Sequence, residues 1–71
     1  MTLERLRSLR EEKRLTQQQV ADHLFIAQRT YSRYETGERA VPLEVLVEIS
    51  KFFDVSTDYL LELTDNRRRF Y

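Results

Sequence analysis

The chain has 71 residues and no cysteine, and its 12 acidic and 12 basic residues give a formal net charge of zero. This length predicts one small domain near the lower limit for burying its own core. The absence of cysteine excludes a disulfide framework and a thiolate zinc site. No apolar run approaches the roughly 18–20 residues of a membrane span, and the N-terminus is charged where a signal peptide is apolar. We therefore expect a soluble, cytoplasmic protein that does not contact a membrane.

Only helices are predicted, because the sequence has no hairpin signal, repeat or low-complexity tract. The first helix follows Thr2, a candidate N-cap, and runs to about Lys13. Leu3, Leu6, Leu9 and Arg10 lie near one face of this helix. The second helix begins at Thr16, whose hydroxyl forms a capping box with Gln19. Its predicted inward residues are Val20, Ala21 and Leu24.

The third helix is predicted from about Ala27 to Thr36, after a break at Phe25 and Ile26, and it ends at Gly37, a residue suited to a C-cap. Tyr31 and Tyr34 point inward. Pro42 fits the first turn of the fourth helix, and Ser56 caps a short fifth helix. The last two helices complete the core with Leu46, Ile49, Phe53, Tyr59, Leu60 and Leu63.

The second and third helices, at about 16–36, have the form of a helix-turn-helix, a unit whose second helix can enter the DNA major groove. Gln28, Arg29 and Arg33 lie on the exposed side of that helix and match base edges in their donors and acceptors. A solvated polar face is the alternative. Residues 1–39 carry eight Lys/Arg against six Asp/Glu, whereas residues 40–66 carry only Lys51 against six acidic residues. This asymmetry is compatible with one DNA-facing side.

The sequence resembles the Xre-type, lambda-repressor-like family of bacterial and phage transcriptional regulators. The resemblance covers nearly all of residues 3–63, through Leu15-Thr16-Gln17, Ala21, Ser32-Arg33-Tyr34-Glu35, Gly37, Arg39, Pro42 and Val55-Ser56-Thr57-Asp58-Tyr59-Leu60-Leu61. It implies an all-α fold of five helices in a compact DNA-binding domain, here residues 1–63, with a tail at 64–71. It also implies dimers that bind double-stranded palindromic operators and repress or activate transcription.

The resemblance assigns roles to individual residues. Gln28, Arg29 and Arg33 would read bases, whereas Thr16, Gln17, Thr30, Ser32 and Arg39 would contact the DNA backbone. The start of the second helix suits a phosphate because its backbone N–H groups and helix dipole are positive there. Arg10 and Glu35 would form a partly buried, structural ion pair.

The chain also departs from the family at its turns. Phe25 stands where Gly or Asn is usual, so either this residue is strained or the turn is remodelled. Ala27 replaces a capping Ser or Thr, and Arg14 and Asp54 stand where glycine is common. Pro42 lies one residue farther from Gly37 than the spacing that is commonest in the family.

Several alternatives remain open in the sequence. Residues 64–71 fit a frayed tail or the start of a linker. Val45 and Phe52 fit either a homodimer surface formed by the end of the fourth helix, the fifth helix and the tail, or a thicker core. An antitoxin-like protein-interaction module on the same fold is the alternative function. No catalytic set can be assembled around His23, the only histidine, and we expect no enzyme activity, cofactor, metal or small-molecule ligand.

Overall fold

The computed structural model describes residues 4–68, which form an all-helical domain without a strand in that range. The helices are α1 (Glu4–Glu12), α2 (Gln17–Leu24), α3 (Gln28–Thr36), α4 (Leu43–Phe53) and α5 (Thr57–Leu60). This arrangement confirms the five-helix prediction. The expected N-cap at Thr2 and the inward position of Leu3 lie outside the described residues.

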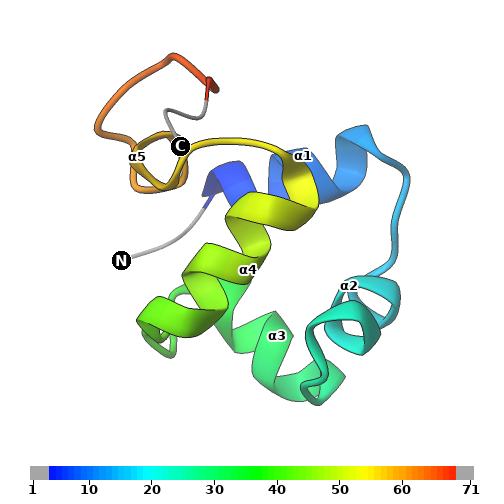
Figure 1. Ribbon diagram of the computed structural model, residues 1–71. Coiled ribbons are helices and arrows are strands. Elements are labelled where there is room, and N and C mark those ends of the chain that lie inside the picture. Colours follow the sequence, from blue (N-terminus) through cyan, green and yellow to red (C-terminus); the bar gives the residue numbers. More distant parts are fainter. Residues whose placement is uncertain (1–3, 69–71) are drawn as a thin grey trace.

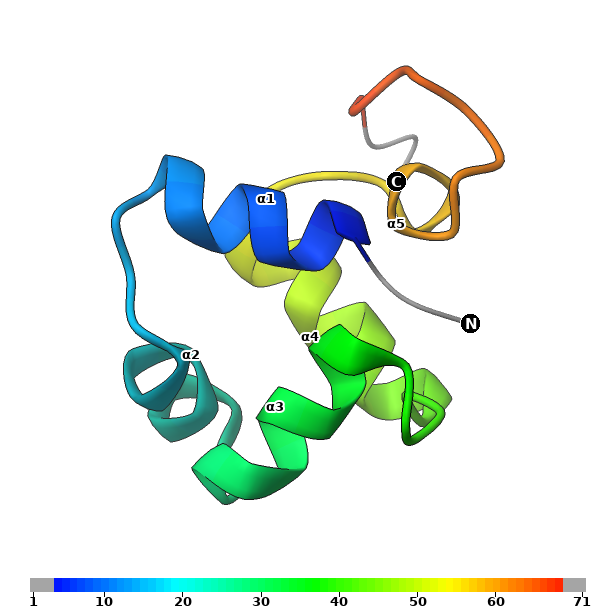
Figure 2. The same cartoon turned by 180° about the vertical axis from the view of Figure 1, so that it is seen from behind.

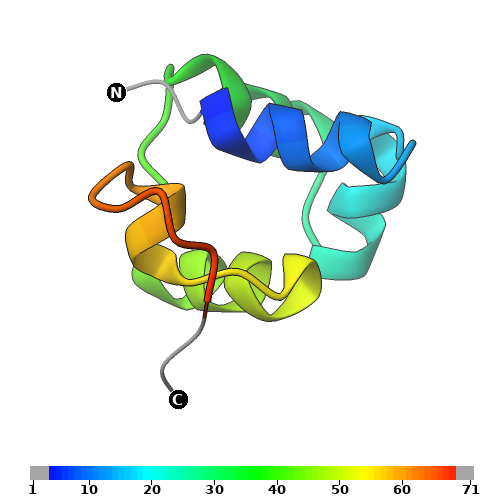
Figure 3. The ribbon, with the colours of Figure 1, turned by 90° about the horizontal axis from the view of Figure 1, so that it is seen from above.

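The helices surround one apolar core (Figures 1 and 2). Helix α2 packs most extensively on α3, α1 contacts α3 and α5, and α4 contacts α2 and α5. Viewed from above, α1 and α4 lie on opposite sides of the domain and α2 lies across one end (Figure 3). Tyr31 and Tyr34 are buried, as predicted. The other core residues are Leu6, Leu9, Val20, Ala21, Leu46, Ile49, Phe53, Val55 and Leu60.

The helix boundaries correct three details of the sequence analysis. Helix α1 ends at Glu12 rather than Lys13, and α3 begins at Gln28 with Ala27 as an N-cap that provides no side-chain hydrogen bond. Pro42 is the N-cap of α4 rather than a residue of its first turn, and its extended backbone (ψ 151°) places its carbonyl to accept from Leu46 N at 2.9 Å.

Four helices end on a non-glycine residue with left-handed backbone conformation, namely Arg14, Phe25, Asp54 and Glu62, with φ between 54° and 62°. After α2, the Phe25 N–H donates to Asp22 O at 3.2 Å and the Ile26 N–H donates to Ala21 O at 3.1 Å. The same pair of hydrogen bonds follows α1, α4 and α5, which is the pattern of the Schellman motif. Of the two expectations for Phe25, the strained conformation is the one observed.

Leu63 does not close the core, and this prediction was wrong. The left-handed conformation of Glu62 ends α5 and turns the chain outward, which leaves Leu63 72% exposed. Tyr59 and Leu24 are only partly buried at the edge of the core. Val45 and Phe52 also pack against the core, and the Phe52 ring lies 4.1 Å from the His23 ring and 4.9 Å from the Phe53 ring. These contacts favour the thicker-core alternative for Phe52.

Phe25 gives a stability prediction. Its backbone has φ 59°, a conformation that costs of order 1–3 kcal/mol for a bulky residue. Its side chain is 95% exposed, so packing of the ring does not offset this cost. We expect Phe25→Gly to raise the free energy of unfolding by about 1 kcal/mol and the melting temperature by about 4–8 °C, measured by thermal circular dichroism. Phe25→Ala is the matched control, because it removes the ring but keeps the Cβ clash. Equal melting temperatures for the two variants would contradict the strain argument.

Candidate nucleic-acid interface

The N-terminus of α2 is fixed by the predicted capping box. The Thr16 hydroxyl accepts from Gln19 N at 3.1 Å, and the Gln19 side-chain oxygen accepts from Thr16 N at 2.8 Å. Both side chains lie at the surface. The box therefore orients the start of α2 and the backbone N–H groups of its first turn.

The first residues of α2 and α3 are joined by their side chains. Gln28 Nε2 donates to Gln17 Oε1 at 2.7 Å, and Gln17 Nε2 donates to Glu35 Oε1 at 3.2 Å. This connection is not predicted from the sequence. Both glutamines are the first residue of a helix, and this shared position is the feature of the sequence that could have indicated their contact. The amide of Gln17 therefore supports Gln28 instead of being a free donor at the surface.

The predicted ion pair between Arg10 and Glu35 is present. Arg10 Nε donates to Glu35 Oε2 at 2.7 Å and Arg10 Nη2 donates to Glu35 Oε1 at 3.3 Å, with the side chains only 14% and 4% exposed. Arg10 Nη1 also donates to Leu15 O at 2.9 Å. The guanidinium thus connects α1, the segment before α2 and the last turn of α3, and it sets how α3 sits on the domain.

The electrostatics of this cluster keep Glu35 ionised. Burial opposes its charge, but hydrogen bonds from Arg10 and Gln17 together with the charge of Arg10 outweigh burial and lower the pKa of Glu35. For Tyr31, burial and then the neighbouring Glu35 raise the pKa of the phenol. The Tyr31 hydroxyl is close to Glu35 but makes no hydrogen bond of good geometry among the described residues. The positive partner of the cluster is Arg10, and Glu35 raises the pKa of its guanidinium further.

The outer face of α3 carries the residues that the sequence analysis selected for base reading. Gln28, Arg29 and Arg33 are exposed, whereas Thr30 and Ser32 are partly exposed. Arg29 and Arg33 are one helical turn apart and therefore share a face. Because Tyr31, Tyr34 and Glu35 are buried, the exposed Gln28, Arg29 and Arg33 lie on the side of α3 away from the core.

The loop after α3 folds back on the helix. Gly37 has φ 82°, a conformation that glycine adopts without a side-chain clash, and Arg39 N donates to Arg33 O at 3.3 Å. Arg39 is exposed. The carboxylate of Glu38 lies 3.7 Å from Arg33 Nε, a pair that the sequence analysis did not foresee. The loop thus places one cation and one anion beside the polar face of α3.

Residues 64–68 are not a frayed tail, because they pack back on the domain. Arg5 Nη1 donates to Tyr59 O at 2.9 Å and to Thr64 O, and Arg5 Nη2 pairs with Asp65 at 2.7 Å. Arg67 pairs with Glu12 at 3.1 Å, and the Arg67 carbonyl accepts from Ser56 N at 2.9 Å. The segment lies at the end of the domain opposite the α2–α3 turn (Figures 1 and 2). The Arg67 charge is therefore remote from the polar face of α3.

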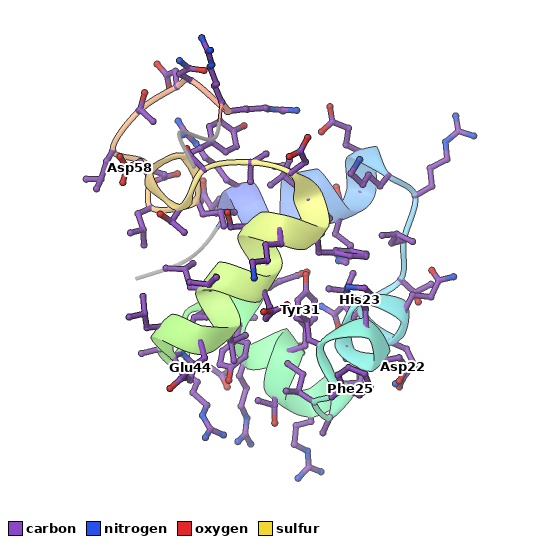
Figure 4. The ribbon with its side chains drawn as sticks, viewed as in Figure 1. Asp22, His23, Phe25, Tyr31, Glu44 and Asp58 are labelled. Carbon is purple, nitrogen blue, oxygen red and sulfur yellow. The ribbon has the colours of Figure 1, made fainter. Side chains whose placement is uncertain are left out.

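His23 lies at the surface, as expected, and its ring faces Phe52 of α4, whereas Asp22 is directed to the outer side of α2 (Figure 4). Asp22 accepts from Gln18 Nε2 at 2.7 Å. The two neighbours therefore have separate partners. No helix within residues 4–68 is long and apolar enough to cross a membrane.

The fold, the two-helix unit and its exposed polar face define a helix-turn-helix domain. A helix-turn-helix family model matches residues 6–60, and the chain belongs to this Xre-type family. The predicted family and fold class are thereby confirmed.

Three relatives illustrate the similarity. The chain is 42% identical over 66 residues to the uncharacterized HTH-type transcriptional regulator YobD of Bacillus subtilis, covering 93% of this chain and 59% of YobD. It is 43% identical over 58 residues to the HTH-type transcriptional activator BcrR of Enterococcus faecalis, covering 82% of this chain and 28% of BcrR. It is 39% identical over 57 residues to the cryptic phage CTXphi transcriptional repressor RstR of Vibrio cholerae, covering 80% of this chain and 51% of RstR. The chain thus spans three fifths or less of these relatives. No solved structure is significantly similar to it.

Proposed function

We propose that this chain binds double-stranded DNA in a sequence-specific manner and regulates transcription in the cytoplasm. The observation that carries the proposal is the exposed face of α3, where Gln28, Arg29 and Arg33 stand beside the capped start of α2. Arginine pairs with guanine O6 and N7, and glutamine pairs with adenine N6 and N7. The proposal involves no catalysis and no cofactor.

The hydrogen bonds around Gln28 support its role as a base-reading residue. Its amide donates to Gln17, which donates to the buried Glu35 carboxylate, which pairs with Arg10. The side chain is therefore oriented before DNA arrives, so less conformational freedom is lost on binding. Its own amide oxygen accepts nothing in this chain of bonds.

The proposed backbone contacts flank this face. Thr16 and Gln17 are at the start of α2, where free N–H groups and the helix dipole favour a phosphate. Thr30 and Ser32 are small hydroxyl residues on α3, and Arg39 lies in the following loop. Contacts of this kind fix position on the duplex without reading its sequence.

We further propose a homodimer that acts as a repressor on a palindromic operator. The candidate dimer surface comprises the end of α4, α5 and residues 64–68, and the exposed Leu63 supplies its apolar part. RstR is named a repressor and supports this sign of regulation, whereas BcrR is named an activator. Sedimentation over a range of concentrations tests the dimer, which a concentration-independent monomer mass would exclude.

Selection of bound fragments from a random pool of duplexes tests the function directly. We expect enrichment of a palindromic site with half-sites about one helical turn apart. Affinity for that site and for random duplex should fall steeply between two salt concentrations, because phosphate contacts release counterions. A protein-interaction module on the same fold would give no enriched site, and DNA binding that ignores salt would also contradict the proposal.

A further inference from the structure

Glu38 places a negative charge between two residues that we propose to contact DNA. Its carboxylate oxygen lies 3.7 Å from Arg33 Nε, and the two side chains are 49% (Arg33) and 68% (Glu38) exposed. Arg39 is the next residue in the chain, and its backbone N–H bonds back to Arg33 O. A binding mode that brings Arg33 to a base edge and Arg39 to a phosphate therefore brings Glu38 close to the duplex.

Such a charge is unfavourable for binding to DNA in general. The duplex carries one negative charge per about 1.7 Å of its axis, and attraction to phosphates supplies essentially all non-specific affinity. Glu38 repels these phosphates and also competes with them for the Arg33 guanidinium. An exposed ion pair adds little to folding stability, so stability gives little reason for a carboxylate at this position.

The position of Glu38 along the guanidinium differs from that of a guanine. Arginine presents five N–H donors in a fixed fork. Glu38 lies on the Nε side of Arg33, which leaves the two terminal nitrogens for the paired acceptors O6 and N7 of guanine. Arg33 can therefore keep Glu38 while it reads a base, and at a matched site the guanine contact offsets the repulsion.

We propose that Glu38 is a specificity-determining residue that positions Arg33 for base reading and weakens its use as a phosphate contact. This inference rests on the proposed function. It implies that Glu38 lowers affinity for random duplex more than affinity for the matched site. A single charge at about 6 Å from a phosphate in water changes a binding constant about threefold, and a duplex presents several phosphates.

The test compares Glu38→Gln with the wild-type protein on the selected site and on a random duplex of equal length. We expect affinity for random duplex to rise about three- to tenfold and affinity for the selected site to rise less, so that the ratio of the two falls. The lost selectivity should concentrate at the base pair read by Arg33. In an Arg33→Ala background, Glu38→Gln should no longer change discrimination at that base pair.

Glu48→Gln provides a closely matched control. Glu48 pairs with Lys51 at the same distance, 3.7 Å, with 60% and 55% of the two side chains exposed, but it lies on α4. This variant makes the same change in net charge and should leave the affinity ratio unchanged. Both variants should stay folded and melt close to the wild-type temperature, because surface pairs of this kind are worth about 0–1 kcal/mol.

The outcomes separate this inference from the function on which it rests. A wild-type protein without salt-dependent DNA binding overturns the proposed function and the role of Glu38 together. A wild-type protein that binds its selected site, with the same affinity ratio in Glu38→Gln as in Glu48→Gln, overturns the role of Glu38 alone. Equal gains on both duplexes would also overturn it, since they indicate a general charge effect.

Discussion

Arg10→Ala is expected to lower the free energy of unfolding by about 3–5 kcal/mol. The substitution leaves the Glu35 carboxylate, whose side chain is 4% exposed, without its cation, and it also removes the hydrogen bond to Leu15 O. A small domain has only about 5–15 kcal/mol of stability in total, so this loss removes a large share of it and should lower the urea midpoint strongly. Urea denaturation followed by circular dichroism measures the loss.

Two comparisons keep this prediction testable even if the variant does not fold. Arg7→Ala removes an exposed partner of Glu11 on the same helix and should cost only about 0.2–0.5 kcal/mol. The double variant Arg10→Met, Glu35→Leu removes both charges and should be more stable than Arg10→Ala, because no charge is left buried alone. A similar loss of unfolding free energy in Arg7→Ala and Arg10→Ala would show that the Arg10–Glu35 pair does not hold α3 on the domain.

The same pair has a definite pH dependence. Because the folded protein lowers the pKa of Glu35, the stabilisation is complete above the ordinary carboxyl pKa and is lost as pH falls through the lowered value. In Arg10→Ala the Glu35 carboxylate has no cation beside it, and protonation in acid removes its unpaired charge. The difference in stability between Arg10→Ala and the wild-type protein should therefore shrink in acid.

Arg33→Ala is expected to relax base preference at one position of the selected site. Loss of a bidentate contact costs about 1–3 kcal/mol, which is about 5- to 150-fold in affinity for the preferred base. The exposed position of Arg33 on the face shared with Arg29 makes a stability effect small. Titration of the variant against the selected duplex and its single-base substitutions measures the change.

Arg39→Ala supplies the contrast, because the proposed role of Arg39 is a phosphate contact. It should weaken binding to every duplex by a similar factor and reduce the magnitude of the salt slope by about one. If Arg33→Ala behaves in the same way, with equal losses on all sequences, then Arg33 contacts the backbone and the proposed reading face is wrong.

The features that the sequence predicted are those encoded by neighbouring residues or by a family pattern. The capping box needs only Thr16 and Gln19, three positions apart, and the helix end at Gly37 needs one glycine. Arg10 and Glu35 are 25 positions apart, and their pairing was expected only because the sequence resembles a known family. The buried face of α3 followed from the three-residue spacing of Tyr31 and Tyr34.

The features that the sequence did not predict depend on tertiary geometry. The contact of Gln17 with Gln28 requires the angle between two helices, and the contact of Arg67 with Glu12 requires the chain to return across the domain. Leu63 was assigned to the core because it continues an apolar spacing. The left-handed conformation of Glu62 interrupts that spacing, and glutamate gives no local signal for this conformation.

The docked C-terminal segment determines where an attached protein would sit. Hydrogen bonds from Arg5 and Ser56 hold the chain as far as Arg67, at the end of the domain opposite the α2–α3 turn. A fluorescent reporter or affinity tag joined directly after Arg68 would therefore begin its path on the side away from α3. Such a fusion should leave the polar face accessible, whereas cutting the chain back to residue 63 would remove Asp65 and Arg67, the ion-pair partners of Arg5 and Glu12.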